Sequence, residues 1–241
     1  MNFSGDHKYT ESVRYYDKIY AFKDYKAEVE RLIAVIRENL RLEGKRLLDV
    51  ACGTGLHLEH LKEQFEVEGL DVSEEMLELA CQRNPGVMFH QRDMVDFSLG
   101  RAFDVVTCLF SSIGYVKTVE NLGRAISCMV RHMIPGGILV LEPWFTPEDW
   151  CSNTVYASFM NEPDLKIARI NTSLAEGCLS YFDMHYLIGT PEGTTHFVEH
   201  HELGLFEPDE MTAAFNAAGL EVRYDPEGLT GRGLYIGLKK G

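Results

Sequence analysis

Residues 47–61 read LLDVACGTGLHLEHL and combine three local patterns that decide the fold. An apolar run ends at Val50, two glycines follow as Gly53 and Gly55, and leucines then recur at helical spacing. The pattern predicts a buried strand, a tight turn and an amphipathic helix. Because glycine lacks a Cβ atom, such a turn exposes backbone N–H groups at a helix start and lets a ligand approach the main chain. We interpret the turn as the floor of a cofactor site.

Strands and helices alternate over the first 143 residues. Helical patterns cover 24–40, 56–64, 74–83 and 118–133, and strand patterns cover 46–51, 66–71, 87–90, 103–109 and 137–142. Such alternation predicts an α/β fold with a doubly wound, Rossmann-like and mostly parallel sheet.

The pattern changes after Trp144. Residues 165–206 contain strand-like runs separated by turns at AEGC and TPEGT, which predict an antiparallel meander or hairpins. A helix over 208–220 and strands over 221–225 and 233–238 then close the chain. The sequence thus predicts an antiparallel insertion before the last helix and strands.

The length of 241 residues suits one domain with an insertion. We expect a single domain over 1–241, with a helical N-terminal arm or lid over 1–40 and the antiparallel insertion over 144–206.

Charge and cysteine usage narrow the function classes. The chain has 23 Lys and Arg against 37 Asp and Glu, a formal charge of −14, and this field repels nucleic acid and anionic membranes. We therefore expect neither as a partner, and an anionic substrate needs a local basic cluster. The six cysteines form no C-x-x-C pair, the N-terminus lacks a signal-peptide core, and no run reaches 18 apolar residues. These features predict a cytoplasmic protein with reduced thiols.

The glycine turn does not fit a dinucleotide site. A dinucleotide fingerprint places a third glycine three residues after the second, where this chain has Leu58. This disfavours an NAD-dependent dehydrogenase. Asp71 ends the next strand, where an acid can accept both ribose hydroxyls of a nucleoside. The alternative is a helix-entry turn that needs glycine for its backbone alone.

Two further segments follow strand ends. HQRDMVDF places Asp93 and Met94 just past the third strand, at the edge where open α/β sheets bind ligands. A carboxylate there can accept an adenine amino group while methionine packs on the ring, or it is a solvated turn residue. CLFSSIGYV leaves the fourth strand through small and polar residues suited to a pocket loop.

The order of DVACGTG, GLDVS, RDM, FDVVTCLFSSIGY and PGGILVLEPW resembles that in class I S-adenosylmethionine-dependent methyltransferases. YYDKIY, FSSIGY, LEPWF and GLTGRGLYIGL further resemble the N,N-dimethyltransferases that act on nucleotide-linked (TDP) amino sugars in desosamine and mycaminose biosynthesis. This resemblance implies S-adenosylmethionine as cofactor, a nucleotide-linked amino sugar as small-molecule acceptor and a role in antibiotic biosynthesis. It also implies that the arm and the insertion form the acceptor pocket.

The resemblance implies three sets of site residues. The catalytic candidate is Tyr115. The cofactor-binding candidates are Tyr16, Tyr20, Asp49, Ala51, Cys52, Gly53, Asp71, Val72, Met76, Asp93, Met94 and Leu109. The substrate-binding candidates are Tyr25, Ser112, Trp144, Arg169 and Arg232.

Several of these candidates have a second interpretation. Tyr115 either hydrogen-bonds or weakly deprotonates the acceptor amine, or it is an aromatic wall of the pocket. Trp144 stacks on a base or sugar, or it is a core aromatic. Arg232 lies between glycines and either binds phosphates bidentately or points into solvent. Tyr16 and Tyr20 either close over the methionine part of the cofactor or pack as a lid or in the core.

The histidines do not predict a metal site. HFVEHHEL holds His196, His200 and His201, but in a strand His196 and His200 lie about 13 Å apart on one face, too far for one ion. His57 and His60 lack nearby Cys or Asp ligands, and we expect both on the surface. No metal is predicted.

Two other functions remain open from the sequence. One is a class I methyltransferase for another small amine or a hydroxyl acceptor. The other is a non-catalytic S-adenosylmethionine-binding module. A homodimer is the expected assembly.

Overall fold

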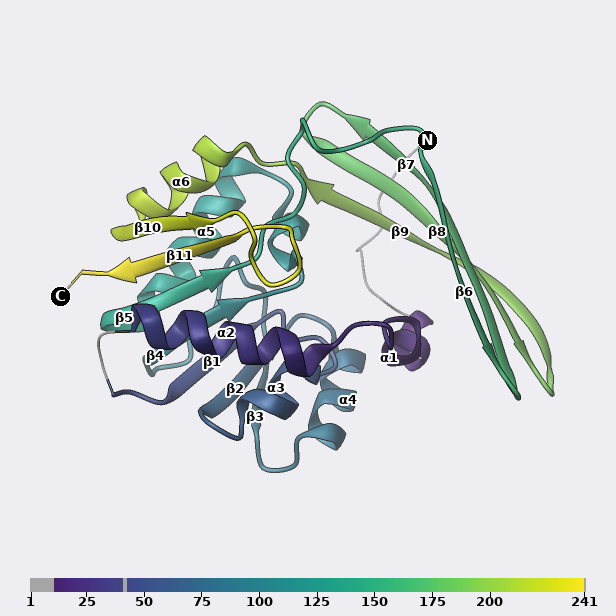
Figure 1. Cartoon of the computed structure of the whole chain (residues 1–241), viewed down its shortest axis with the longest axis horizontal. Coiled ribbons are helices and arrows are strands. Elements are labelled where there is room, and N and C mark those ends of the chain that lie inside the picture. Colours follow the sequence, from purple (N-terminus) through teal and green to yellow (C-terminus); the bar gives the residue numbers. More distant parts are fainter. Residues whose placement is uncertain (1–10, 41–42, 241) are drawn as a thin grey trace.

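The computed structural model describes residues 11–40 and 43–240, and within them two sheets form (Figure 1). The larger sheet has seven strands in the order β10-β11-β5-β4-β1-β2-β3. Strands β1 to β5 pair in parallel, and β11 pairs antiparallel with both β5 and β10. Its strands are β1 (Arg46–Val50), β2 (Glu66–Asp71), β3 (Met88–Gln91), β4 (Phe103–Cys108), β5 (Met133–Leu141), β10 (Leu220–Asp225) and β11 (Leu234–Lys239). This is the predicted doubly wound, mostly parallel α/β sheet.

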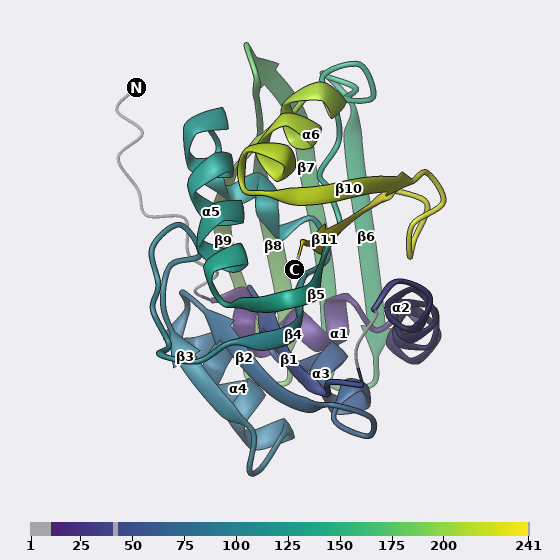
Figure 2. The same ribbon diagram turned by 90° about the vertical axis from the view of Figure 1, so that its left-hand side faces the viewer.

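Helices cover both faces of this sheet, and Figure 2 shows α2 and α5 on opposite sides of β4 and β5. Apolar residues of α5 and α6 form one core with Leu48, Val50 and Val106, whereas those of α2, α3 and α4 form another with Leu47 and Val105. The helices are α2 (Tyr25–Asn39), α3 (Leu56–Leu61), α4 (Glu74–Arg83), α5 (Val119–Arg131) and α6 (Pro208–Ala217). Alternate residues of each central strand thus enter different cores, as expected for strands buried on both faces.

The strand, turn and helix of the opening stretch form as predicted. Leu47, Leu48 and Val50 are fully buried, and the chain then turns through positive φ at Gly53 and Gly55. A Cβ atom on Gly55 would lie 2.7 Å from the Asn84 amide, whereas one on Gly53 would meet nothing within 4 Å. Gly55 is therefore needed for packing, while Gly53 leaves open space above the main chain.

Several predicted boundaries differ from the structure. The helices expected over 56–64, 118–133 and 208–220 end at Leu61, Arg131 and Ala217. The strand expected from residue 137 begins at Met133, since the PGG segment lies within β5 at a shift of register rather than in a turn before it. The cause is local: Gly136 takes a φ of 81°, which interrupts the ladder while β4 and β5 stay paired on both sides.

The second sheet is antiparallel, in the order β6-β7-β8-β9, and stands beside the larger sheet with α1 (Tyr16–Ile19) between them (Figure 1). Its strands are β6 (Val155–Glu162), β7 (Leu165–Glu176), β8 (Leu179–Thr190) and β9 (Gly193–Gly204). Turns at AEGC and TPEGT join β7 to β8 and β8 to β9, as predicted. β6 was not predicted, because this edge strand is exposed on both faces along most of its length and so lacks alternation.

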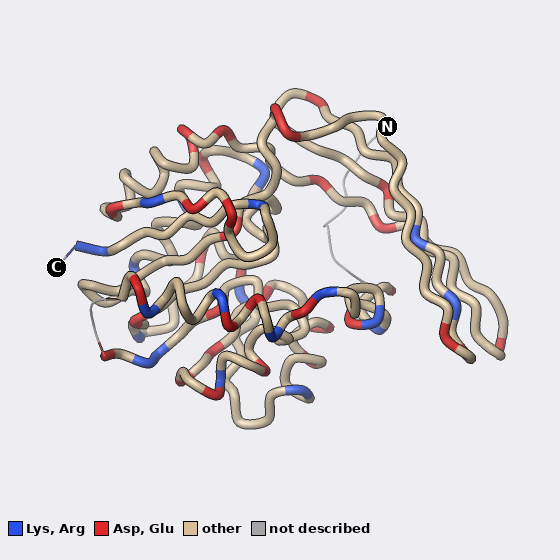
Figure 3. Tube along the Cα trace, in the orientation of Figure 1, with Lys and Arg blue, Asp and Glu red and all other residues tan. Residues whose placement is uncertain are grey.

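The arm begins the described chain with the short helices η1 (Ser12–Tyr15) and α1, and the first ten residues of the expected arm lie outside the described residues. Among the described residues, no helix has the length and apolar content needed to span a membrane. Lys and Arg are interspersed with Asp and Glu along the described chain (Figure 3).

Candidate active site

A cavity of about 1210 Å³ lies between the carboxyl ends of the parallel strands and the inner face of the antiparallel sheet. Loops after β1, β2, β3 and β4 line one side, β6 to β9 line the other, and the arm contributes Tyr16, Tyr20 and Lys23. The predicted residues that line it are Tyr16, Tyr20, Ala51, Gly53, Asp71, Val72, Met76, Asp93, Met94, Ser112, Tyr115, Trp144, Arg169 and Arg232. Residues far apart in sequence therefore meet in one space.

Asp71 joins the glycine turn to the end of β2. Its Oδ2 accepts the Gly53 N–H at 2.8 Å, and its Oδ1 accepts the Ser73 N–H at 3.0 Å. Burial raises the pKa of this carboxyl group, and the two backbone donors oppose that effect. Since a carboxylate oxygen has two lone pairs, Asp71 can still accept two ribose hydroxyls from the cavity.

Further residues at this edge form a shallow apolar wall. Met76, a buried residue of α4, lines the cavity. Met94 also lines it and packs against the core. Asp93 accepts the Val95 N–H at 3.0 Å, so its turn is fixed and one carboxylate oxygen remains available. A flat ring with an amino group matches this combination of a carboxylate and a thioether.

The arm is fixed to both sides of the cavity. Tyr16 and Tyr20 lie 4.6 Å apart by ring centroids, and the Tyr20 hydroxyl accepts a hydrogen bond from Arg169 Nη1 at 3.0 Å. Burial raises the pKa of Tyr16 well above its ordinary value, so this phenol stays neutral. Tyr16 lines the cavity together with Asp71, and its role as a lid over the cofactor stays a prediction.

A second link holds the arm to the glycine turn. Asp17 accepts a hydrogen bond from Thr54 Oγ1 at 2.7 Å and pairs with Arg83, which also donates to the Thr54 carbonyl. None of the three was singled out from the sequence, because residues 17, 54 and 83 show no shared spacing. The turn and the arm are consequently held as one unit.

Four predicted residues lie outside the cavity lining. Asp49 is buried under the turn, where Thr107 Oγ1 donates to it at 2.7 Å and burial raises its pKa to about 6. Cys52 and Leu109 are buried in the core of the α2 face. Tyr25 packs edge-on against His57, with ring centroids 5.0 Å apart. Contact of these four with a ligand in the cavity stays a prediction.

The surface position predicted for His57 is wrong. His57 is 7% exposed, and its Nε2 lies 3.1 Å from Glu28, which also pairs with Lys23 at 3.0 Å. Lys23 Nζ in turn lies 3.8 Å from the centre of the Phe110 ring. A buried carboxylate such as that of Glu28 in α2 requires partners, and Lys23 and His57 supply them. These contacts could not be found from local spacing.

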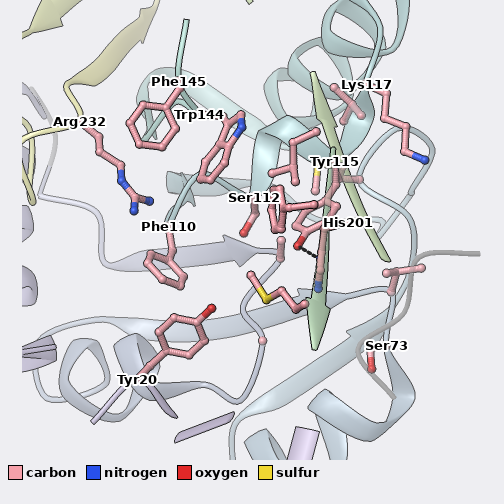
Figure 4. Close-up of a pocket in the computed structure, with 18 of the residues that line it drawn as sticks. Tyr20, Ser73, Phe110, Ser112, Tyr115, Lys117, Trp144, Phe145, His201 and Arg232 are labelled. Carbon is pink, nitrogen blue, oxygen red and sulfur yellow. Dashed lines mark hydrogen bonds between the residues drawn. The ribbon is translucent and has the colours of Figure 1, made fainter. Parts of the chain in front are cut away.

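Aromatic and basic side chains form the opposite end of the cavity (Figure 4). The Arg232 guanidinium lies 5.5 Å from the rings of Trp144 and Phe145 and donates to Ser111 Oγ at 3.1 Å. Trp144 Nε1 donates to Ser180 Oγ at 3.0 Å, which fixes the indole in the wall. Arg232 therefore points inward, and the protein, despite its net negative charge, presents a cation in the cavity.

Tyr115 belongs to η2 (Ser112–Val116), the short helix after β4, and faces the inner surface of the antiparallel sheet. Its hydroxyl oxygen lies 3.0 Å from Nδ1 of His201, a residue considered in the sequence only as a metal ligand (Figure 4). The signal in the sequence was the alternation of β9, which puts His201 on the inner face and its neighbour His200 on the outer one.

Comparisons with known proteins agree with this geometry. A family model described as a methyltransferase domain matches residues 47–137. The dTDP-3-amino-3,4,6-trideoxy-alpha-D-glucopyranose N,N-dimethyltransferase of Streptomyces venezuelae is 43% identical over 90% of this chain and 92% of its own. The dTDP-4-amino-2,3,4,6-tetradeoxy-D-glucose N,N-dimethyltransferase of Saccharopolyspora spinosa is 39% identical over 93% and 91%. The S-adenosylmethionine-bound structure of CalS10, an amino pentose methyltransferase from Micromonospora echinaspora, superposes with a TM-score of 0.86 at 37% identity, covering 98% and 100%.

The fold and the cavity define a class I S-adenosylmethionine-dependent methyltransferase. Within this class, the chain belongs to the family of the amino sugar N,N-dimethyltransferases, as its identity and coverage show.

Replacement of Asp71 by Ala is expected to weaken S-adenosylmethionine binding by about 1.5–3 kcal/mol, roughly 10- to 150-fold in Kd, since hydrogen bonds to a charged group are lost. Isothermal titration calorimetry measures this. Glu66→Ala, at the exposed opposite end of the same strand, is the control and should bind normally. Equal affinities for the two variants would contradict a cofactor role for Asp71.

Proposed function

We propose that this methyltransferase N,N-dimethylates the amino group of a nucleotide-linked (TDP) deoxy amino sugar. The names of the two curated relatives support this acceptor class, and they differ in whether the amine is at position 3 or 4. One observation carries the proposal: a single cavity joins a carboxylate end at Asp71 to an aromatic and cationic end at Trp144 and Arg232.

The carboxylate end suits the cofactor. Asp71 accepts the ribose hydroxyls, Asp93 accepts the adenine amino group, and Met94 packs on the adenine ring. Tyr16 and Tyr20 cover the methionine part from the arm. S-adenosylmethionine supplies a methyl group that is already activated on a sulfonium. The carboxyl groups of Asp49 and Asp71, both buried next to the glycine turn, offset the positive charge of that sulfonium.

The other end suits a nucleotide-linked sugar. Trp144 offers a flat surface for a base or sugar ring, and Ser112 and Tyr115 offer hydroxyls to the sugar. Arg232 matches phosphate oxygens, because a guanidinium donates to two of them at once. Arg169, which is buried and donates to Tyr20, adds a second positive charge to the same cavity.

Catalysis rests mainly on positioning. The acceptor nitrogen must be neutral, in line with the methyl group and shielded from water, and such orientation can contribute about 7–11 kcal/mol in favourable cases. The nitrogen lone pair forms the new N–C bond while the C–S bond breaks and its electron pair stays on sulfur. A tyrosine hydroxyl at position 115 can hold the amine in this line.

The outer face of the antiparallel sheet supports a homodimer. Pairing registers place Phe159, Ala168 and Leu187 in one row across β6, β7 and β8, and Phe159 is 74% exposed. Further exposed apolar residues on this face are Val155, Ile170 and Leu174. Because contiguous apolar patches are uncommon on monomers, a second copy packing its own sheet here is the proposed occupant.

The cytoplasm is the proposed location, and nucleic acid and membranes are not proposed as partners. The net charge of −14 and the interspersed charges of Figure 3 support this, as do six cysteines that are all free, three of them exposed.

Incubation with S-adenosylmethionine and a panel of TDP-linked 3-amino and 4-amino deoxy sugars tests the acceptor class. Mass spectrometry is expected to find one and then two methyl groups added to an amino sugar, while the matching hydroxy sugars stay unmodified. Methylation of the hydroxy sugars, or of small amines without a nucleotide, would favour the other acceptor classes.

Arg232→Ala is expected to raise the KM for the nucleotide sugar roughly 10- to 150-fold, since a charged hydrogen bond to phosphate is lost, and to leave the cofactor Kd unchanged. The effect should shrink as salt is added. Arg223→Ala, an exposed arginine on β10, is the matched control. An equal loss of cofactor affinity would place Arg232 in the cofactor site or in the support of the fold.

Phe159→Lys is expected to give monomers in analytical ultracentrifugation, because two lysines would then be buried in the sheet-to-sheet contact. Val119→Lys, at a comparably apolar exposed site on α5, should stay dimeric. A dimer that survives Phe159→Lys would exclude this face.

A further inference from the structure

Tyr115, His201 and Glu199 form a chain of titratable groups at the wall of the cavity, which Tyr115 and His201 both line. The Tyr115 hydroxyl oxygen lies 3.0 Å from His201 Nδ1, and His201 Nε2 lies 3.9 Å from a carboxylate oxygen of Glu199. His201 and Glu199 are only 4% and 5% exposed. We propose that this chain takes the proton from the bound acceptor ammonium, with His201 as the group that receives it through Tyr115.

The surroundings of His201 suit this role. Phe182 of β8 stacks on the imidazole, with ring centroids 5.2 Å apart and planes at 15°, so the ring is held in place by an uncharged neighbour. The Glu199 carboxylate accepts the backbone N–H of Ser12 at 3.1 Å and its hydroxyl at 2.7 Å. The arm therefore fixes the carboxylate, and β9 fixes the histidine beside it.

The Glu199 carboxylate lies 3.9 Å from His201 Nε2, beyond hydrogen-bond distance, and acts on the imidazole through its charge. A carboxylate on the Nε2 side favours the tautomer with its proton on Nε2, which leaves Nδ1 as the acceptor toward Tyr115. The same carboxylate stabilises the imidazolium that forms. Among the described residues close to Tyr115 and His201 in the chain, Lys117 after η2 and Glu202 of β9 are charged, and they pair with each other at 2.7 Å.

The proton transfer is balanced at each atom. The acceptor ammonium gives one proton to Tyr115 Oη while Tyr115 gives its own hydroxyl proton to His201 Nδ1. The products are a neutral amine, a neutral phenol and an imidazolium. The amine lone pair then attacks the methyl carbon, the C–S bond breaks, and the electron pair remains on sulfur. His201 then gives its extra proton to water, so that it can accept the next one.

The inference rests on the proposed function, which requires that the acceptor amine lose a proton before it is methylated. An amine is mostly protonated at neutral pH, whereas histidine has an ordinary pKa of about 6.5 and can accept a proton there. Each methyl transfer also leaves an ammonium product, so a second transfer needs a second deprotonation. A base inside the closed cavity lets the enzyme bind the abundant ammonium form directly.

His201→Asn separates proton acceptance from positioning. An asparagine amide can still hydrogen-bond to Tyr115 but cannot take a proton. We expect kcat/KM for the amino sugar to match the wild type above the pKa of the acceptor amine, and to fall below it by about tenfold for each pH unit, because only neutral amine then reacts. Tyr115→Phe should give the same fall below the pKa of the amine, since it breaks the same path, but from a lower plateau, since it also removes the hydroxyl that holds the amine.

Two further variants sharpen this test. His200→Asn is the matched control, since His200 lies on the outer face with its Nδ1 2.7 Å from Asp183, and its pH profile should equal the wild type. Glu199→Gln removes the carboxylate that stabilises the imidazolium, so the acid limb should move to lower pH, opposite to His201→Asn. Calorimetric binding of S-adenosylmethionine verifies that each variant is folded.

Three results would overturn the proton path. They are an unchanged pH profile in His201→Asn, a loss in that variant that is equal at every pH, and a shift to higher pH in Glu199→Gln. In each case the wild-type enzyme still methylates the amino sugar, and the proposed function stands. A wild-type enzyme that methylates no amine at any pH would overturn the proposed function and the proton path together.

Discussion

The buried carboxylate of Asp71 is the interaction on which the site depends. It connects the N–H group of Gly53, in the turn after β1, with that of Ser73, at the start of α4. Together with the hydrogen bonds from Arg83 and Asn84 to the Thr54 and Gly55 carbonyls, this link holds the turn after β1 against the start and end of α4. A Cβ atom on Gly53 would meet nothing within 4 Å, and Gly53 and Asp71 both line the cavity.

Three parts of the chain enclose the cavity around Asp71. The parallel sheet presents its carboxyl edge, the arm is held over it through Asp17 and Tyr20, and the antiparallel sheet closes the far side. Asp71 and Asp93 lie toward one end of the cavity and Arg232 toward the other, an arrangement that suits the cationic cofactor and the anionic acceptor of the proposed function. The protein thereby offsets a net charge that would repel a phosphate from most of its surface.

The sequence predicts most of what depends on local pattern. Alternating strands and helices give the parallel sheet, and the positions of Asp71 and Asp93 at strand ends bring both to one edge. The turns at AEGC and TPEGT separate the strand-like runs that form β7, β8 and β9, so these antiparallel strands could be predicted. The same logic fails for β6, whose residues are exposed on both faces and carry no period.

Contacts across the chain were beyond the reach of local pattern. The Lys23, Glu28 and His57 cluster joins the arm, α2 and α3, and its members look like surface residues when taken separately. His201 approaches Tyr115 only because the antiparallel sheet folds back over η2, 86 residues away in sequence. Such pairs are set by the docking of two sheets, which no window of residues records.

The central claim is that one cavity holds the cofactor and the nucleotide sugar with the acceptor amine at Tyr115. A crystal structure of the complex with S-adenosylhomocysteine and a TDP-linked amino sugar tests it most directly. We expect the ribose hydroxyls of the cofactor on Asp71, the phosphates of the sugar on Arg232 and the amine within hydrogen-bonding distance of the Tyr115 hydroxyl. A nucleotide bound outside the cavity, or an amine facing away from Tyr115, would contradict the claim.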